Sequence, residues 1–272
     1  MRVKQIKIEF YVTTEIKRYV YVYLIATEHE CVLIDSGVVG SEKIIEKEIL
    51  EIGHNPADVH AVFLTHAHPD HIGTAHYFRE KYGAKIYASE GERAWIEDID
   101  LQFEQRPIPN FYNLAGESTI VDSVVKNGDR IWLTDNVHIE VIGTPGHSAD
   151  EVSYRIGNMA FIGDTVPVKE DIPIFVNLDN TRRSLAVLEN MSGVEVFYPA
   201  WDQEYSLEVM RKKIVEAREL ISNLERTVCD VDPEIELSAL VNEVCDRLHK
   251  PMWETNPLFA RTITCCRMMK SD

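Results

Sequence analysis

The feature that most constrains this 272-residue chain is the segment His66-Ala67-His68-Pro69-Asp70-His71, which holds four potential metal ligands in six positions. Residues 59–65 precede it as an apolar run that predicts a buried strand, and a helical pattern follows. Side chains that leave a strand end and enter a helix can converge on one point. Imidazole and carboxylate groups together suit zinc or iron. The segment therefore predicts a metal site at the carboxyl end of a strand.

Strand and helix patterns alternate along the first two-thirds of the chain, which indicates an α/β architecture. Strands are predicted at residues 19–26, 31–34, 59–65, 84–88, 130–133, 137–142, 151–156, 159–162 and 194–199. Helices are predicted from Ser41 to the turn at Gly53 and over residues 71–82, ended by Gly83. Residues 98–128 are loop-rich and are predicted to form an insertion over the site.

The chain beyond Trp201 has a helical pattern. One apolar stripe recurs at three and four residues and comprises Leu207, Met210, Ile214, Ala217, Ile221 and Leu224. A second helix is predicted to start at Asp232-Pro233. We therefore expect a catalytic domain over residues 1–204 and a C-terminal helical extension, residues 205–272, packed on it. Core packing is the favoured role of these stripes, and a homodimer interface is the alternative.

Charge and composition narrow the class of partner. The formal net charge is −17, which opposes the approach of nucleic acids, so we expect a small-molecule substrate and no nucleic-acid partner. No uninterrupted apolar run is long enough to span a bilayer, and residues 1–10 carry charges where a signal peptide needs an apolar centre. The five cysteines form no regular framework, which suits a reducing compartment. A cytoplasmic protein without membrane attachment is the expectation.

Two further motifs follow the histidine-rich segment in order. His147 lies in Thr-Pro-Gly-His-Ser at residues 144–148, and Asp164 ends Phe-Ile-Gly-Asp at residues 161–164. An Asp-Ser-Gly turn begins at Asp35. With these motifs, residues 15–205 resemble the metallo-β-lactamase superfamily, whose signature is HxHxDH followed at a distance by a lone His and a lone Asp.

The resemblance implies a four-layer αββα sandwich with metals along one edge. It implies that His66, His68 and His147 hold a first metal and that Asp70 and His71 hold a second, with Asp164 bridging both. Asp70 and Asp164 are also the candidates for orienting a nucleophile and managing its proton. Asp35 is expected to support the site or form its turn instead of holding a metal. Zinc is the expected metal, with one or two ions per chain, and iron or manganese are alternatives.

The chain departs from the family at the last ligand, which is usually a His in a turn after a late strand. Trp201 stands at that position, in Pro199-Ala200-Trp201-Asp202, and an indole cannot bind a metal. Asp202, one position later, is the candidate replacement ligand, and a surface turn carboxylate is its alternative role. The second metal is therefore expected to bind more weakly than the first.

Hydrolysis through a metal-bound hydroxide is the leading function, on a small-molecule ester, thioester, lactone or related bond. Residues 98–128 and 167–180 are expected to shape the pocket. Their large apolar side chains suggest a moderately apolar substrate: Phe103, Phe111, Tyr112, Ile174 and Phe175. Two alternatives remain. One is a mononuclear-iron oxidoreductase of the persulfide-dioxygenase type, for which loss of the last His is acceptable, and the other is a non-catalytic metal-binding relic.

Overall fold

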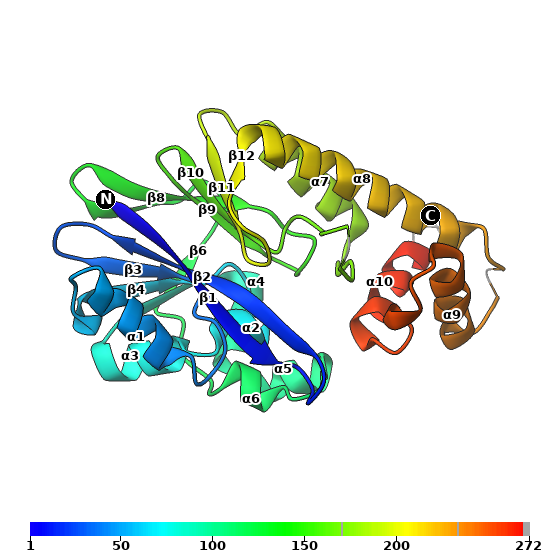
Figure 1. Cartoon of the computed structure of the whole chain (residues 1–272), viewed down its shortest axis with the longest axis horizontal. Helices are drawn as coiled ribbons and strands as arrows, with labels where there is room; N and C mark the ends of the chain where they lie inside the picture. The colour runs from blue at the N-terminus through cyan, green and yellow to red at the C-terminus, as the bar shows by residue number, and fades with distance from the viewer. Residues whose placement is uncertain (170, 233, 269–272) are drawn as a thin grey trace.

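The computed structural model describes residues 1–169, 171–232 and 234–268, and it contains two six-stranded sheets packed face to face (Figure 1). The first sheet has the order β1-β2-β3-β4-β5-β6 and the second the order β12-β11-β10-β9-β8-β7. The strands of the first are β1 (Arg2–Tyr11), β2 (Lys17–Ala26), β3 (Cys31–Ile34), β4 (Val59–Phe63), β5 (Lys85–Ser89) and β6 (Ser123–Val125). Those of the second are β7 (Arg130–Thr134), β8 (Val137–Gly143), β9 (Val152–Ile156), β10 (Met159–Gly163), β11 (Val196–Pro199) and β12 (Tyr205–Ser206).

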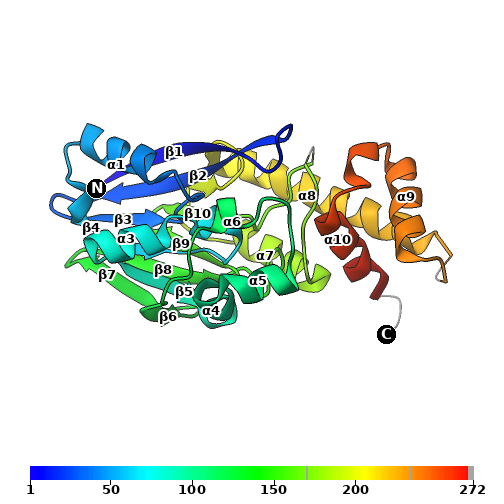
Figure 2. The ribbon, with the colours of Figure 1, turned by 90° about the horizontal axis from the view of Figure 1, so that it is seen from below.

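Helices cover the outer face of each sheet, as Figure 2 shows from below. The first sheet carries α1 (Glu42–Glu51), α3 (Ala75–Tyr82) and α4 (Glu90–Glu97), and the second carries α7 (Leu178–Glu189) and α8 (Leu207–Cys229). The remaining elements are η1 (Pro56–Asp58), α2 (Pro69–Ile72), α5 (Ile99–Gln105), α6 (Tyr112–Ala115), α9 (Leu237–Leu248), η2 (Pro251–Trp253) and α10 (Pro257–Met268). The predicted four-layer αββα sandwich is confirmed.

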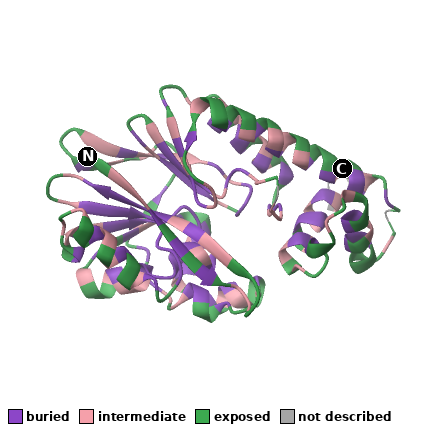
Figure 3. Ribbon diagram, in the orientation of Figure 1, coloured by how far each residue is buried: buried purple, intermediate pink, exposed green. Residues whose placement is uncertain are grey.

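Three apolar cores correspond to the three junctions between the four layers. Strand β2 shows how a continuous apolar run serves two of them, because successive side chains point to opposite faces. Val22 and Leu24 lie in the core under the helices of the first sheet, whereas Tyr23 and Ile25 lie between the sheets. Figure 3 accordingly shows long buried stretches in the strands of both sheets.

The third core joins the second sheet to the C-terminal helices. It is one cluster of contacting residues, with members from Ala160 on β10 to Cys266 on α10. The predicted apolar stripe of α8 belongs to it. Strand β12, at residues 205–206, pairs with β11. None of the helices in the described ranges is long and apolar enough to cross a membrane.

One predicted helix is broken in the structure. Residues 71–82 divide into α2 and α3 at Gly73 and Thr74, because the loop after β3 packs against this point. Gly73 N donates to Gly37 O at 2.8 Å, and a Cβ at Gly73 would lie 2.3 Å from Val39 N. The close approach of this loop therefore requires a glycine at position 73.

Other predictions were wrong at the boundaries of elements. Residues 98–128 are more ordered than an insertion loop, since they form α5, α6 and β6, and Phe111 is buried in the core. Helix α9 begins at Leu237 instead of Asp232, whose Oδ1 accepts a hydrogen bond from Glu234 N in a turn. Pro233 lies outside the described residues. Strand β1 and helix α4 were not predicted.

Candidate metal centre

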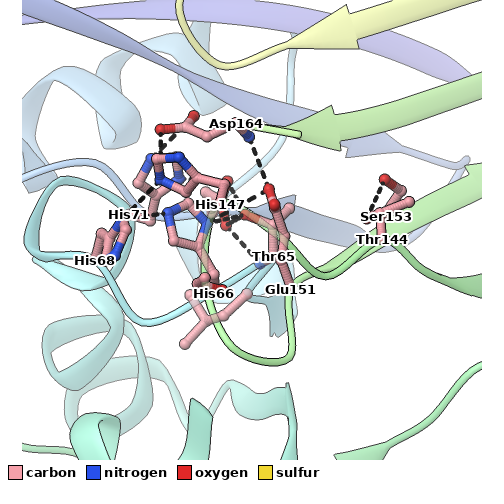
Figure 4. A network of polar contacts seen from close by, with 12 residues as sticks. Thr65, His66, His68, His71, Thr144, His147, Glu151, Ser153 and Asp164 are labelled. Atoms are coloured by element: carbon pink, nitrogen blue, oxygen red, sulfur yellow. Dashed lines mark hydrogen bonds and ion pairs between the residues drawn. The ribbon is translucent and has the colours of Figure 1, made fainter. Parts of the chain in front are cut away.

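The ligand candidates all follow strands that end at one edge of the sandwich. His66, His68, Asp70 and His71 follow β4, His147 follows β8, and Asp164 directly follows β10. Figure 4 shows the four imidazole rings turned toward one another, with Asp164 beside them. The structure therefore brings together histidines that lie far apart in the sequence, such as His66 and His147.

Three ring nitrogens converge in the first group, His66, His68 and His147. His68 Nδ1 lies 3.0 Å from His66 Nε2 and 2.8 Å from His147 Nε2. Burial lowers the pKa of His66 and His68 well below the usual range and that of His147 to about 4. Three neutral imidazoles facing one point have lone pairs to share and few protons to donate, which is the donor set of a tightly held divalent metal.

The far nitrogens of two of these rings are fixed by neighbouring groups. His66 Nδ1 lies 3.0 Å from Thr65 Oγ1, and His147 Nδ1 donates to the carbonyl oxygen of Ile174 at 3.0 Å. Such contacts hold the ring in place and leave Nε2 free to coordinate.

The second group, Asp70, His71 and Asp164, has three buried polar atoms that lack a hydrogen-bond partner among the described residues. They are Asp70 Oδ2, His71 Nε2 and Asp164 Oδ1. His71 Nε2 lies 3.6 Å from Asp70 Oδ2 and 3.5 Å from Asp164 Oδ1. Buried groups without partners are costly, so three of them around one point fit a bound cation.

Neighbouring charges set the protonation of this group. Burial would lower the pKa of His71, but the carboxylates of Asp164, Asp35 and Asp70 outweigh it and raise that pKa well above the usual range. Asp35 also fixes the ring, since its Oδ2 lies 2.8 Å from His71 Nδ1. Asp35 therefore supports a ligand candidate, as expected from the sequence.

Trp201 lies beside the ligands and contacts one of them directly. Its indole Nε1 donates to Asp164 Oδ2 at 2.7 Å, and its ring packs near Phe10 and Tyr19. Trp201, which stands in place of the usual last His, thus binds one carboxylate oxygen of Asp164, the candidate bridging ligand. It orients Asp164 without adding a metal donor.

Asp202 is not brought to the metal centre, and its expected role as a replacement ligand is corrected. Its Oδ1 accepts from Gln203 N at 2.8 Å, its Oδ2 accepts from Tyr205 Oη at 2.9 Å, and Oδ2 lies 3.3 Å from Lys213 Nζ. These contacts satisfy both oxygens at the start of β12 and α8. The described residues contain two clusters of converging ligand atoms, His66–His68–His147 and His66–His71–Asp164, and Asp202 belongs to neither.

Glu92 on α4 connects the two histidine loops, and no sequence motif points to it. Its Oε2 accepts from Ala67 N at 3.0 Å, between two ligand candidates. Its Oε1 accepts from Ser148 Oγ at 2.6 Å and from Asp150 N at 3.0 Å, beside His147. One buried carboxylate therefore holds the β4 and β8 loops at a fixed separation.

Glu151 supports Asp164 in a similar way. Its Oε1 accepts from Asp164 N at 2.9 Å, and burial raises the pKa of Glu151 well above the usual range. Gly163, at φ +50°, passes so close that a Cβ there would lie 2.7 Å from that oxygen. A glycine before Asp164 is therefore required by the packing as well as by the turn.

The histidines without a matching motif lie outside the centre and have local roles. His54 Nδ1 lies 3.3 Å from Asp58 Oδ2, and His76 Nδ1 lies 2.9 Å from the carbonyl oxygen of Ser118. His249 caps the C-terminal end of α9 in a left-handed conformation.

Residues 16–200 match the family model described as the metallo-beta-lactamase superfamily, so the chain belongs to this superfamily. Relatives include the probable metallo-hydrolase YqgX of Bacillus subtilis (strain 168), 30% identical over 53% of this chain and 64% of that protein. Another is the hydroxyacylglutathione hydrolase of Thiobacillus denitrificans, 32% identical over 39% of this chain and 32% of that protein. The matches span less than two-thirds of the length of either relative.

Solved structures share the fold along nearly the whole chain. A metallo-beta-lactamase family protein from Thermus thermophilus aligns with a TM-score of 0.74 and 18% identity, covering 98% of this chain and 92% of that one. A beta-lactamase domain protein from Burkholderia ambifaria aligns with a TM-score of 0.71 and 16% identity, over 96% of this chain and 85% of that one. At these identities the likeness concerns the fold.

Proposed function

We propose that this chain is a metal-dependent hydrolase that cleaves an ester, thioester, lactone or related bond of a small molecule. The observation that carries the proposal is the convergence of His66, His68 and His147 beside the unpartnered atoms of Asp70, His71 and Asp164. The relatives reported above are named as hydrolases, which supports the same class.

A bound divalent metal would supply an activated hydroxide near neutral pH and polarise the substrate carbonyl. The protein's own part is to fix geometry and handle protons. Asp70 Oδ2 and Asp164 Oδ1 are carboxylate oxygens without hydrogen-bond partners in the described chain, so either can orient a nucleophile or hold its proton. Trp201 keeps Asp164 in one orientation through its indole hydrogen bond.

Water access to the centre is restricted by the segment that follows β10. Ile174 O accepts from His147, while Phe175 N and Pro173 O both bond to Thr262 Oγ1 on α10. The ligand imidazoles are at most 7% exposed. This segment therefore connects His147 to α10.

We propose zinc as the metal, with one ion held by the three imidazoles and a second held more weakly. Metal analysis of protein purified without added metal, combined with assays on ester, thioester and lactone substrates, tests the proposal. Zinc with turnover supports it. Metal-loaded protein that cleaves none of these bonds contradicts it and favours the relic.

A second candidate is a mononuclear-iron oxidoreductase, favoured by the occupation of Asp164 Oδ2 by Trp201. In that case His66 or His68, His147 and Asp164 would approximate a site of two histidines and one carboxylate. Iron in place of zinc, with oxygen consumption and no hydrolysis, would select this function.

A further inference from the structure

Arg106 is a buried cation at the end of α5, and the metal centre's ligand set makes no use of it. The residue is 6% exposed, and no hydrogen bond or ion pair of the described residues engages its guanidinium, although none of its nitrogens is among the fully buried atoms that lack a partner. Burying an arginine without a direct partner is unfavourable, and proteins seldom keep one in this state without a use for it.

The placement of α5 directs Arg106 toward the metal centre. Fully buried Gln102 donates from Nε2 to Ala67 O at 2.6 Å, so this helix is attached directly to the His66–His68 loop. Arg106 N bonds to Gln102 O at 2.7 Å, and Arg106 caps the C-terminal end of the helix. Arg106 therefore ends a helix that is attached directly to the loop of His66 and His68.

The charge of Arg106 acts on residues of the metal centre. Burial lowers the pKa of Arg106 to about 10, while the charges of Asp70 and Asp164 act in the opposite direction. After burial, the Arg106 charge is the largest influence that lowers the pKa of His68. Asp70 and Asp164 would be shared with a bound metal, and Glu92 also acts on the guanidinium.

A second cation stands near Arg106. Arg261 on α10 donates to the carbonyl oxygen of Gln105, the residue before Arg106, and its charge lowers the pKa of Arg106. The chain as a whole carries a charge of −17. Two arginines therefore lie close together at the end of α5, in a protein whose net charge otherwise repels anions.

We propose that Arg106 binds a carboxylate or phosphate group of the substrate, so that the molecule cleaved is an acidic one. This inference rests on the proposed hydrolase function and adds the substrate class. A planar guanidinium forms two parallel hydrogen bonds with either oxyanion, and such bonds are strong in a site with little water. The anion would fix the substrate while its scissile bond lies at the metal centre.

The test compares matched esters of para-nitrophenol on the metal-loaded protein. The neutral ester is the acetate, the carboxylate arm is the succinate monoester, and the phosphate arm is the ester of phosphonoacetate. Wild type should prefer at least one anionic ester by kcat/KM. In Arg106→Gln this preference should fall about 10- to 100-fold, as expected for loss of a charge-assisted pair. The arm with the larger fall identifies the anion.

The matched control is Arg211→Gln, which makes the same charge change at an exposed position on α8 and should keep the wild-type preference. Arg106→Lys keeps a charge but loses the planar fork, so it should lose part of the preference and serves if Arg106→Gln fails to fold. A wild type without preference for either anionic ester overturns the proposal. So does an unchanged preference in a folded Arg106 variant with normal metal content.

Calorimetric titration with succinate and phosphonoacetate separates this proposal from the hydrolase function, because it needs no turnover. Binding at least about tenfold weaker in Arg106→Gln than in Arg211→Gln supports the anion site, even if no ester is cleaved. Equal binding in the two variants rejects it, even if the protein proves to be a hydrolase.

Discussion

The two ligand groups of the metal centre differ in how completely the protein has built them. In the first, three imidazole nitrogens meet at 2.8–3.0 Å around His68, and Glu92 joins the loops that carry them. In the second, Asp70, His71 and Asp164 meet at 3.5–3.6 Å, and Trp201 uses an oxygen of Asp164. The groups therefore differ in donor set: the first offers three imidazoles, whereas the second offers one imidazole and two carboxylates, one of which also accepts from Trp201.

The largest effect is expected when a histidine of the first ligand group is removed. His66→Ala or His147→Ala should remove the tightly bound metal and abolish activity, because two imidazoles are too few to hold it. Metal analysis and turnover measure both effects. His54→Ala, at a histidine away from the centre, is the control and should behave as wild type. Near-normal metal content in both ligand variants would show that the first group is misassigned.

A smaller effect is expected from the carboxylate that joins the first group's loops. Glu92→Ala should weaken the first metal about 10- to 100-fold, since it frees the loops of His66, His68 and His147, and should affect the second metal less. Glu92→Gln keeps an acceptor oxygen and should lose less affinity. Competition with a chelator measures the affinities, and equal weakening of both metals would contradict the division into two groups.

Trp201→His should raise the affinity of the second ligand group for a metal ion. A histidine there restores a nitrogen donor and releases Asp164 Oδ2, so the affinity for the second metal should rise at least about tenfold, or about 1.4 kcal/mol. Trp201→Phe releases the oxygen without adding a donor and separates the two contributions. If both variants bind the second metal as wild type does, the indole is not what weakens the site.

The smallest effect is expected at Asp202. Asp202→Ala should leave the metal count unchanged, because its oxygens are engaged by Gln203, Tyr205 and Lys213. Its stability loss should be within about 1 kcal/mol, since the carboxylate is partly exposed. Thermal unfolding and metal analysis of the variant test both statements. A fall in metal content would show that Asp202 is a metal ligand.

Local pattern predicted the α/β alternation and the metal site of residues 66–71, whereas the sandwich and the roles of His147 and Asp164 were implied by the resemblance to the superfamily. Six ligand positions follow strand ends, and strand ends at one sheet edge bring distant residues together. Glu92 was missed because it lies on a helix with no motif, and its role comes from tertiary hydrogen bonds to Ala67 and Ser148. Arg106 was missed because it caps a helix with no motif. Asp202 was misjudged because sequence order does not show that a side chain has nearer partners.

Stepwise dialysis against a chelator, with metal and turnover measured at each step, tests most directly the claim that the two ligand groups are unequal. Starting from two ions per chain, one ion should leave first, and hydrolysis should persist while the other remains on His66, His68 and His147. Activity should then disappear with the last ion. Simultaneous loss of both ions, or loss of all activity with the first, would contradict the account.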